Sequence, residues 1–238
     1  MDFYNTDFYD KASTEYSNKR YKGKTSSYIQ FFFKRRLTIA LEIIGKNLRG
    51  RKSLRIIEGG CADGIVLDTI LNKFPDNFVN CFGTDISPEM IEVANKRNTN
   101  KNISYFLKGA GETGQFDFVL AIGFLTPSIF DIEFSYIKKY LKSDGIVILS
   151  LASRDSIYTR IKLQKEEYIK DYLKHKEYEK SLNKDFELLS SHPYGFFIPK
   201  LWAFPSIARF LQPLIENIMK YITPNLFHEK LYILRKRS

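Results

Sequence analysis

The sequence predicts an α/β fold: a Rossmann-like, seven-stranded, mostly parallel sheet with helices on both faces and an antiparallel last strand. Short apolar runs alternate with helical patterns between residues 53 and 151, which is the order that builds parallel βαβ units. The first apolar run meets a glycine-rich turn over residues 59–64, and the second ends at a carboxylate, Asp85. Strand, tight turn, helix, strand and carboxylate follow one another as in a nucleoside-binding unit.

The first two thirds of the chain supply five of the strands. Residues 1–27 predict a loose arm, and Tyr28–Asn47 predicts a helix with Phe33, Leu37, Leu41 and Ile44 on its apolar face. We expect strands over residues 53–58, 78–84, 103–107, 116–122 and 146–151, with helices over 64–74, 87–97 and 134–141. Ser87 is the expected N-cap of the middle helix, because Pro88 and Glu89 suit its first turn. Residues 142–145 predict a turn before the fifth strand.

The last third has a different pattern. A charged helical stretch over residues 158–184 precedes a strand over 186–190, an amphipathic helix over 206–222 that Pro213 should kink, and a strand over 226–235. The apolar stripe of the amphipathic helix comprises Ile207, Phe210, Leu211, Leu214, Ile215, Ile218, Met219 and Ile222. No linker divides the chain, so we expect one domain over 1–238, with an arm and helix over 1–48, a ligand-binding core over 49–152 and a substrate-side part over 153–238.

Composition narrows the class of protein. Of 238 residues, 44% are hydrophobic and 27% charged, which excludes an intrinsically disordered chain. No apolar run approaches the ~20 residues of a membrane span, and the first residues do not resemble a signal peptide. Two cysteines fit a reducing cytoplasm, where we expect the protein, and predict no metal site. The net charge of +10 indicates either an anionic partner or a solvated lysine-rich surface, and we favour the second.

The glycine turn indicates which ligand it holds. A dinucleotide fingerprint starting at Gly60 would need glycine where Ala62 and Ile65 stand, and no phosphate-binding G-K-[ST] occurs. Glu58, at the end of the first strand, would repel a pyrophosphate but suits a ligand that carries an ammonium and a sulfonium. Asp85 can accept hydrogen bonds from both ribose hydroxyls.

Four motifs follow one another along the chain: Glu58-Gly59-Gly60-Cys61-Ala62-Asp63-Gly64, Thr84-Asp85-Ile86-Ser87-Pro88-Glu89-Met90, the fourth-strand run 116–125 and Leu141-Lys142-Ser143-Asp144-Gly145. In this order they resemble the motifs of the class I S-adenosylmethionine (SAM)-dependent methyltransferases. The resemblance is to the small-molecule enzymes of the ubiquinone/menaquinone-biosynthesis type and covers about Phe8 to Ala152. It implies an enzyme that uses SAM as methyl donor and releases S-adenosylhomocysteine (SAH).

The resemblance also implies the cofactor contacts. Glu58 and the turn would hold the methionine end, Asp85 the ribose, and Ile86 and Met90 the adenine. The expected cofactor-binding residues are Tyr16, Arg20, Glu58, Gly60, Cys61, Ala62, Gly64, Asp85, Ile86, Met90, Gly111, Glu112, Ile122 and Gly123. Tyr16 and Arg20 belong to an arm that either folds over SAM or frays at the surface. Ala110 replaces the family's usual adenine-binding aspartate, a role that either Glu112 or backbone groups could take.

The methyl acceptor is less defined. Residues 121–124 lack the (Asp/Asn)-Pro-Pro-aromatic motif of base-amine methyltransferases, so we expect a small-molecule or lipid-like acceptor, methylated at oxygen. His192 is a weak candidate for a catalytic base, and we expect His175 to face solvent. An RNA methyltransferase is one alternative, although the basic residues are spread along the chain, which argues against nucleic acid. A non-catalytic methyltransferase-like binding subunit is the other, and the oligomeric state is not indicated.

The amphipathic helix allows three interpretations. It either covers the sheet edge, lines an apolar acceptor pocket, or lies on a membrane surface as a peripheral contact. For the last of these, the basic residues expected to meet lipid headgroups are Arg209, Lys220, Lys230, Arg235, Lys236 and Arg237.

Overall fold

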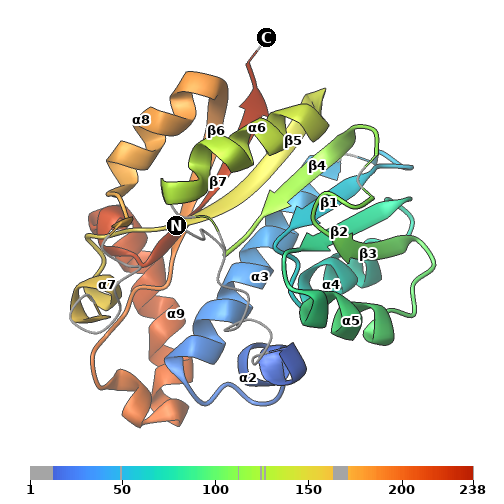
Figure 1. Cartoon of the computed structure of the whole chain (residues 1–238). Helices are drawn as coiled ribbons and strands as arrows, with labels where there is room; N and C mark the ends of the chain where they lie inside the picture. The colour runs from blue at the N-terminus through green and yellow to red at the C-terminus, as the bar shows by residue number, and fades with distance from the viewer. Residues whose placement is uncertain are drawn as a thin grey trace.

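A seven-stranded sheet in the order β3-β2-β1-β4-β5-β7-β6 forms the centre of the protein (Figure 1). The structure is a computed structural model that describes residues 13–48, 50–111, 113–123, 125, 127–162 and 171–237. The strands are β1 (Ile56–Gly59), β2 (Cys81–Asp85), β3 (Ile103–Leu107), β4 (Phe116–Ala121), β5 (Leu141–Ala152), β6 (Phe186–Tyr194) and β7 (Glu229–Lys236). β1 to β5 are parallel, and β7 runs antiparallel to both of its neighbours. The predicted fold class is confirmed.

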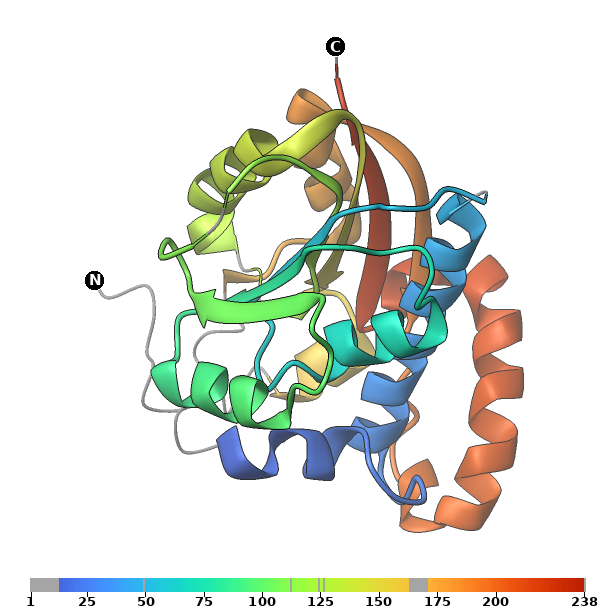
Figure 2. The same ribbon diagram turned by 90° about the vertical axis from the view of Figure 1, so that its right-hand side faces the viewer.

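Helices cover both faces of the sheet (Figure 2). They are α2 (Tyr16–Arg20), α3 (Tyr28–Leu48), α4 (Ile65–Lys73), α5 (Pro88–Arg97), α6 (Phe130–Tyr140), α7 (Ile157–Lys162), α8 (His175–Asp185) and α9 (Pro205–Ile222). One core lies between the sheet and α3, α4 and α5, and a second lies between the sheet and α6 and α8. Successive strand residues serve different cores: Ile56 belongs to the first and Ile57 to the second. Burial on both faces explains why the strands are continuously apolar.

Local signals place several elements correctly. The Ser87 hydroxyl accepts a hydrogen bond from the Met90 N–H at 3.1 Å, and Pro88 opens α5, as predicted. β1 is shorter than expected, since Leu54 pairs with Phe78 only through an isolated bridge. Residues 142–145 belong to β5, although the pairing with β4 passes directly from Leu141 to Ile146. The predicted turn is therefore an irregularity inside a longer strand.

The charged stretch 158–184 contains two helices, α7 and α8, and the solvent position expected for His175 is wrong. His175 is 1% exposed, and its ring contacts the Tyr232 hydroxyl at 3.0 Å and the Phe227 carbonyl at 3.3 Å. Tyr178 and Leu182 follow it on the buried side of α8. The abundant lysine and glutamate of this stretch hid a narrow stripe that packs against the second core.

The face that α3 buries differs from the prediction. Ile44 is fully buried, but Phe33, Leu37 and Leu41 are half-buried at the edge of the core. The other buried positions of the helix are instead Tyr28, Phe31, Phe32, Arg36, Ile39, Ala40, Ile43 and Leu48. Three consecutive phenylalanines made the apolar face ambiguous in the sequence.

The C-terminal third corrects two further expectations. α9 continues as one helix through Pro213, and its most buried residues are Ala208, Gln212 and Glu216 rather than the predicted apolar stripe. Lys230 is 6% exposed and pairs with Glu179 at 3.1 Å, so it cannot meet a lipid headgroup. The basic residues 235–237 lie at the far end of β7, next to the C-terminus and away from α9 (Figure 1).

Candidate functional site

The carboxylates of Glu58 and Asp85 lie at the same edge of the sheet, on the adjacent strands β1 and β2. Glu58 pairs in register with Gly83, two residues before Asp85. The turn after β1 crosses to β2, because the Cys61 N–H donates to the Thr84 carbonyl at 3.0 Å. The two stretches that the sequence singled out therefore converge at the carboxyl ends of the parallel strands, where such sheets bind ligands.

The turn requires a left-handed backbone at three positions. Gly60, Ala62 and Gly64 have φ values of 65°, 48° and 79°. A Cβ at Gly64 would lie 2.6 Å from the Tyr105 hydroxyl oxygen, so glycine is needed there for space as well as for conformation. Ala62 adopts the same region with a side chain, which is unfavourable for an L-residue.

Asp85 is held rigidly by backbone donors. Its Oδ2 accepts from the Ala62 N–H at 2.9 Å, and its Oδ1 accepts from the Ser87 N–H at 3.0 Å. The carboxylate is 9% exposed. An ionised carboxylate has about four acceptor positions, so its chemistry suits hydroxyl donors as well as backbone N–H groups, as recognition of a ribose diol requires.

Glu58 is a buried carboxylate with an oxygen that a cationic ligand could contact. Its side chain is 2% exposed, and Oε2 has no hydrogen-bond partner among the described residues. Burial raises the pKa of Glu58 well above its usual value, although the Arg36 charge and the Leu67 N–H oppose the increase. A ligand ammonium beside Oε2 would satisfy this atom and stabilise the carboxylate. The residues present therefore fit the charged amino-acid end of SAM.

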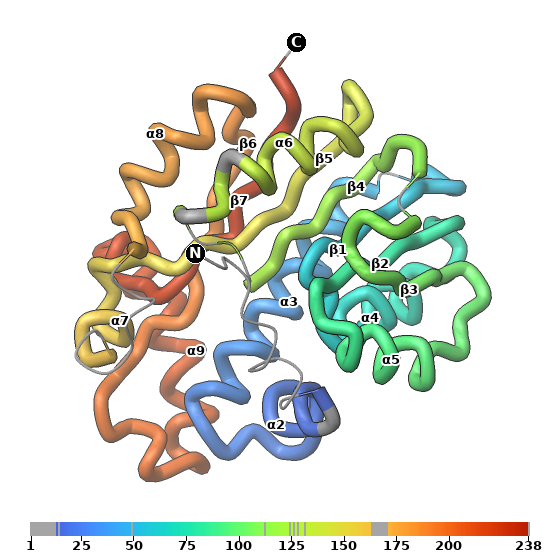
Figure 3. Tube along the Cα trace, in the orientation of Figure 1, coloured from blue at the N-terminus to red at the C-terminus, as the bar shows by residue number. Residues whose placement is uncertain are grey.

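The N-terminal arm is attached to the glycine turn. The Ser17 N–H and hydroxyl both donate to Asp63 Oδ2, and Arg97 from α5 donates to the same oxygen at 2.9 Å. Figure 3 shows α2 beside α3. In α2 the Arg20 guanidinium lies 4.0 Å from the ring centroid of Tyr16. Helix α2 of the arm thus lies against the site, and a contact of Tyr16 or Arg20 with SAM remains a prediction.

The other predicted cofactor residues differ in their exposure. Ile86 is half-buried at the strand end, whereas Met90 and Cys61 are almost completely buried, Met90 in α5 and Cys61 inside the turn. Ile122 is buried, and Gly111 is half-buried in the loop after β3. Glu112 lies outside the described residues. Ile86 is therefore better placed than Met90 to contact a ligand base.

A buried polar cluster that sequence reasoning missed lies next to Gly123, beyond β4. The Gly123 N–H donates to the Ser150 hydroxyl at 2.8 Å, and a Cβ at Gly123 would lie 2.1 Å from Arg36 Nη1. Arg36 is 3% exposed and lies 3.9 Å from Glu229, which accepts from the Tyr194 hydroxyl. One signal could have revealed it: Arg36 interrupts the apolar stripe of α3.

The histidines lie in different surroundings. His192 is on β6, where burial lowers its pKa and the nearest influential charges are Lys46, Glu42 and Lys220 from α3 and α9. None of these groups comes from the strand ends that carry Glu58 and Asp85. His228 precedes β7 beside the Arg36 cluster, and burial lowers its pKa to about 4, so it is a neutral imidazole at pH 7.

Comparisons with known proteins agree with this geometry. A family model described as a methyltransferase domain matches residues 28–189. Magnesium protoporphyrin IX methyltransferase from Synechocystis PCC 6803 with bound SAH is similar at a TM-score of 0.67 and 12% identity, with 98% of each chain covered. A SAM-dependent methyltransferase from Thiobacillus denitrificans in complex with SAH gives 0.58 and 14% identity over 95% of this chain and 97% of that one.

The same fold also occurs in a protein named for different chemistry. The [4+2]-cyclase SpnF is similar at a TM-score of 0.64 and 14% identity, with 98% of this chain and 95% of that chain covered. No curated protein sequence matches the chain. At these identities the structural likeness shows the fold alone, and the family rests on the matching family model.

Proposed function

The chain belongs to the methyltransferase-domain family of class I SAM-dependent enzymes, and we propose that it transfers the SAM methyl group to an oxygen atom of a small, apolar or lipid-linked acceptor. SAM supplies a methyl group that its sulfonium has already activated. One observation carries the proposal: Glu58 and Asp85 lie at the ends of the neighbouring strands β1 and β2, and the buried Glu58 Oε2 has no hydrogen-bond partner among the described residues. The relatives that contain bound SAH support SAM as the cofactor.

In this proposal each part of the site has a role. Glu58 and the backbone of the turn at Gly60, Cys61, Ala62 and Gly64 hold the amino-acid end of SAM. Asp85 holds the ribose hydroxyls, and Ile86 packs against the adenine. The arm, held by the Ser17–Asp63–Arg97 contacts, would exclude water from the reacting groups. Because the methyl group is already activated, the chain mainly has to align the acceptor with it.

We place the acceptor beyond β4 and β5, beside Gly123. Support comes from the buried cluster of Arg36, Glu229, Tyr194 and Ser150, whose hydroxyl and carboxylate groups could orient a polar acceptor oxygen. The absence of an amine-binding motif after β4 supports oxygen over a base amine. His192 stays a weak candidate for a base, and its surroundings on β6 do not strengthen it.

Two further parts of the proposal concern the whole protein. We propose that the chain acts in the cytoplasm, which its two free, buried cysteines support. We also propose that residues 1–238 form one domain, because β6 and β7 extend the sheet that β1 to β5 begin.

Transfer of a labelled methyl group tests the proposal. The full chain is incubated with methyl-labelled SAM and a cell extract, which is then separated into organic-soluble, small aqueous, RNA and protein fractions. We expect label in the organic or small aqueous fraction, lost with Asp85→Asn. Label in RNA would favour an RNA methyltransferase, and absence of transfer despite SAM binding would favour a non-catalytic subunit or the different chemistry for which the cyclase relative is named.

A further inference from the structure

Helix α9 turns its apolar side to solvent, the reverse of an ordinary surface helix. Phe210 is 71% exposed, Ile218 59% and Ile207 53%. The exposed large hydrophobic side chains, which we call the α9 stripe, are Phe204, Ile207, Phe210, Leu214, Ile218, Tyr221 and Ile222. Spacings of three and four residues place them along one side of the helix. Figure 2 shows α9 at the outer edge of the molecule, with no other element outside it in that view.

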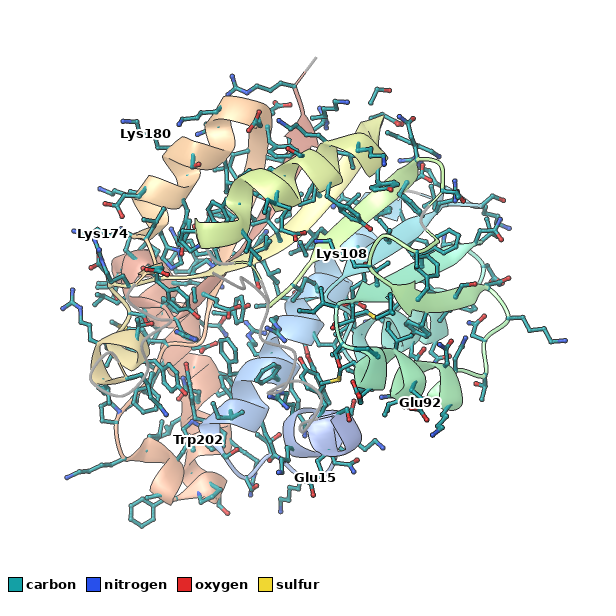
Figure 4. All side chains as sticks on the ribbon, viewed as in Figure 1. Glu15, Glu92, Lys108, Lys174, Lys180 and Trp202 are labelled. Carbon is teal, nitrogen blue, oxygen red and sulfur yellow. The ribbon has the colours of Figure 1, made fainter. Side chains whose placement is uncertain are left out.

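The opposite side of α9 is polar and is bonded to the protein. Glu216 accepts from the Gly195 and Phe196 N–H groups at 2.9 and 2.8 Å, and Arg35 of α3 lies 3.6 Å from it. Gln212 accepts from the Trp202 indole N–H at 3.3 Å; Figure 4 labels Trp202 beside α9. These bonds fix the rotation of the helix. The outward direction of the stripe is therefore a property of the fold.

The charges of α9 complement an anionic surface. The helix carries three charged residues, Arg209, Glu216 and Lys220. The acidic one, Glu216, is 2% exposed and faces inward. The two basic residues are half-buried, and Arg209 also donates to the Thr25 carbonyl at 2.8 Å. Two exposed lysines lie in segments that precede these helices, Lys24 before α3 and Lys200 before α9. An apolar stripe flanked by basic residues is the composition of a helix that lies in a lipid headgroup region.

We propose that the α9 stripe docks the protein on the surface of an anionic lipid bilayer. Within the described part of the chain, none of the helices has the length and apolarity that crossing a bilayer needs, so the contact would be peripheral. A second copy of the chain fits less well. Two α9 helices packed antiparallel about Leu214 would bring Arg209 of one beside Lys220 of the other, and these like charges repel.

Docking through α9 would also orient the strand-end edge. Gly195 and Phe196, which Glu216 holds, directly follow β6, and Tyr28 of α3 donates to the Gly195 carbonyl at 2.8 Å. The polar side of α9 is thus bonded to the same end of the sheet as Glu229 and Tyr194. This inference goes beyond the proposed methyl transfer and does not depend on it.

Vesicle flotation tests the inference. The full chain is mixed with vesicles of phosphatidylcholine and phosphatidylglycerol, or of phosphatidylcholine alone, and SAH binding is measured on the same samples. We expect flotation with the anionic vesicles, and an at least tenfold lower partition coefficient for an Ile207→Glu, Phe210→Glu double variant. Lys220→Gln should lower partitioning to anionic vesicles about fivefold. SAH binding should be unchanged in all variants.

A matched control separates the stripe from general surface hydrophobicity. Ile132 on α6 has the same exposure as Ile207, 53%, and Ile132→Glu should float as the wild type does. Absence of flotation by the wild type would overturn the proposal, and so would equal losses for Ile132→Glu and Ile207→Glu. A dimer in solution that Ile207→Glu dissociates, without flotation of the wild type, would assign the stripe to a second copy instead.

Discussion

Replacing Asp85 by asparagine removes one of the two carboxylate oxygens without changing the shape of the side chain. The two oxygens accept from the Ala62 and Ser87 N–H groups, and in the proposed complex both also accept from ribose hydroxyls. An amide has one acceptor oxygen, so one hydroxyl and one backbone N–H lose their partner. A hydrogen bond to a charged group contributes about 1.5–3 kcal/mol. SAM affinity should therefore fall about 10- to 150-fold.

Isothermal titration calorimetry with SAM and with SAH measures this loss. Because the two ligands share the ribose, both should weaken by the same factor. Asp144→Asn is the matched control, since that carboxylate is 71% exposed and belongs to β5 outside the site; its affinities should equal those of the wild type. Undiminished binding by Asp85→Asn, or a loss confined to one of the two ligands, would refute the assignment of Asp85 to the ribose.

Three further predictions follow from burial and backbone geometry. Glu58→Gln should weaken SAM binding tenfold or more. Because burial raises the pKa of Glu58, its ionised carboxylate destabilises the ligand-free wild type increasingly above about pH 4.5. The substitution should therefore stabilise the ligand-free protein more at pH 7 than at pH 4, and a variant less stable than wild type at pH 7 would contradict this expectation. Gly64→Ala should lower the free energy of unfolding by more than the roughly 1–2 kcal/mol that a left-handed alanine costs, because its Cβ meets the Tyr105 hydroxyl. The control is Gly50→Ala, where φ is +73° and the space is open, so urea unfolding should show only the backbone effect. Equal losses of stability in the two variants would argue against the Tyr105 contact. Burial lowers the pKa of His175 to about 3 and that of His228 to about 4, so protons favour the unfolded state below about pH 6.5. Each of these histidines should lower the unfolding free energy by about 2 kcal/mol between pH 7.5 and 5, and the total decrease should be about 2 kcal/mol smaller in His175→Gln. An unchanged decrease in that variant would exclude His175 as one of its sources.

Much of the fold can be predicted from the sequence because its signals are local. The alternation of apolar runs and helices gives the order of the parallel strands, and the Ser87-Pro88 pair fixes the start of α5. The glycine turn, Glu58 and Asp85 stand at the ends of two predicted strands. Parallel strands bring their carboxyl ends to the same edge of a sheet. For this reason Glu58 and Asp85 could be placed at one site without knowledge of the strand order.

The remaining errors concern contacts between distant segments. The pattern of α9 predicts an amphipathic helix, but it does not say which side meets the protein; Glu216 decides this by bonding to backbone N–H groups after β6. Arg36 lies beside Tyr194 and Glu229 only because α3 packs against β6 and β7. His175 is buried through Tyr232, 57 residues further along the chain. Periodicity within one helix carries no information about such partners.

The central claim is that Glu58 and the glycine turn bind SAM, and competition between nucleosides of opposite charge tests it most directly. Glu58 and the turn should select SAM, which carries an ammonium and a sulfonium, over a dinucleotide that carries a pyrophosphate. In calorimetry with the full chain we expect one SAM bound per protein, displaced by SAH and unaffected by an equal concentration of NAD. Displacement of SAM by NAD, or no saturable binding of SAM, would contradict the account.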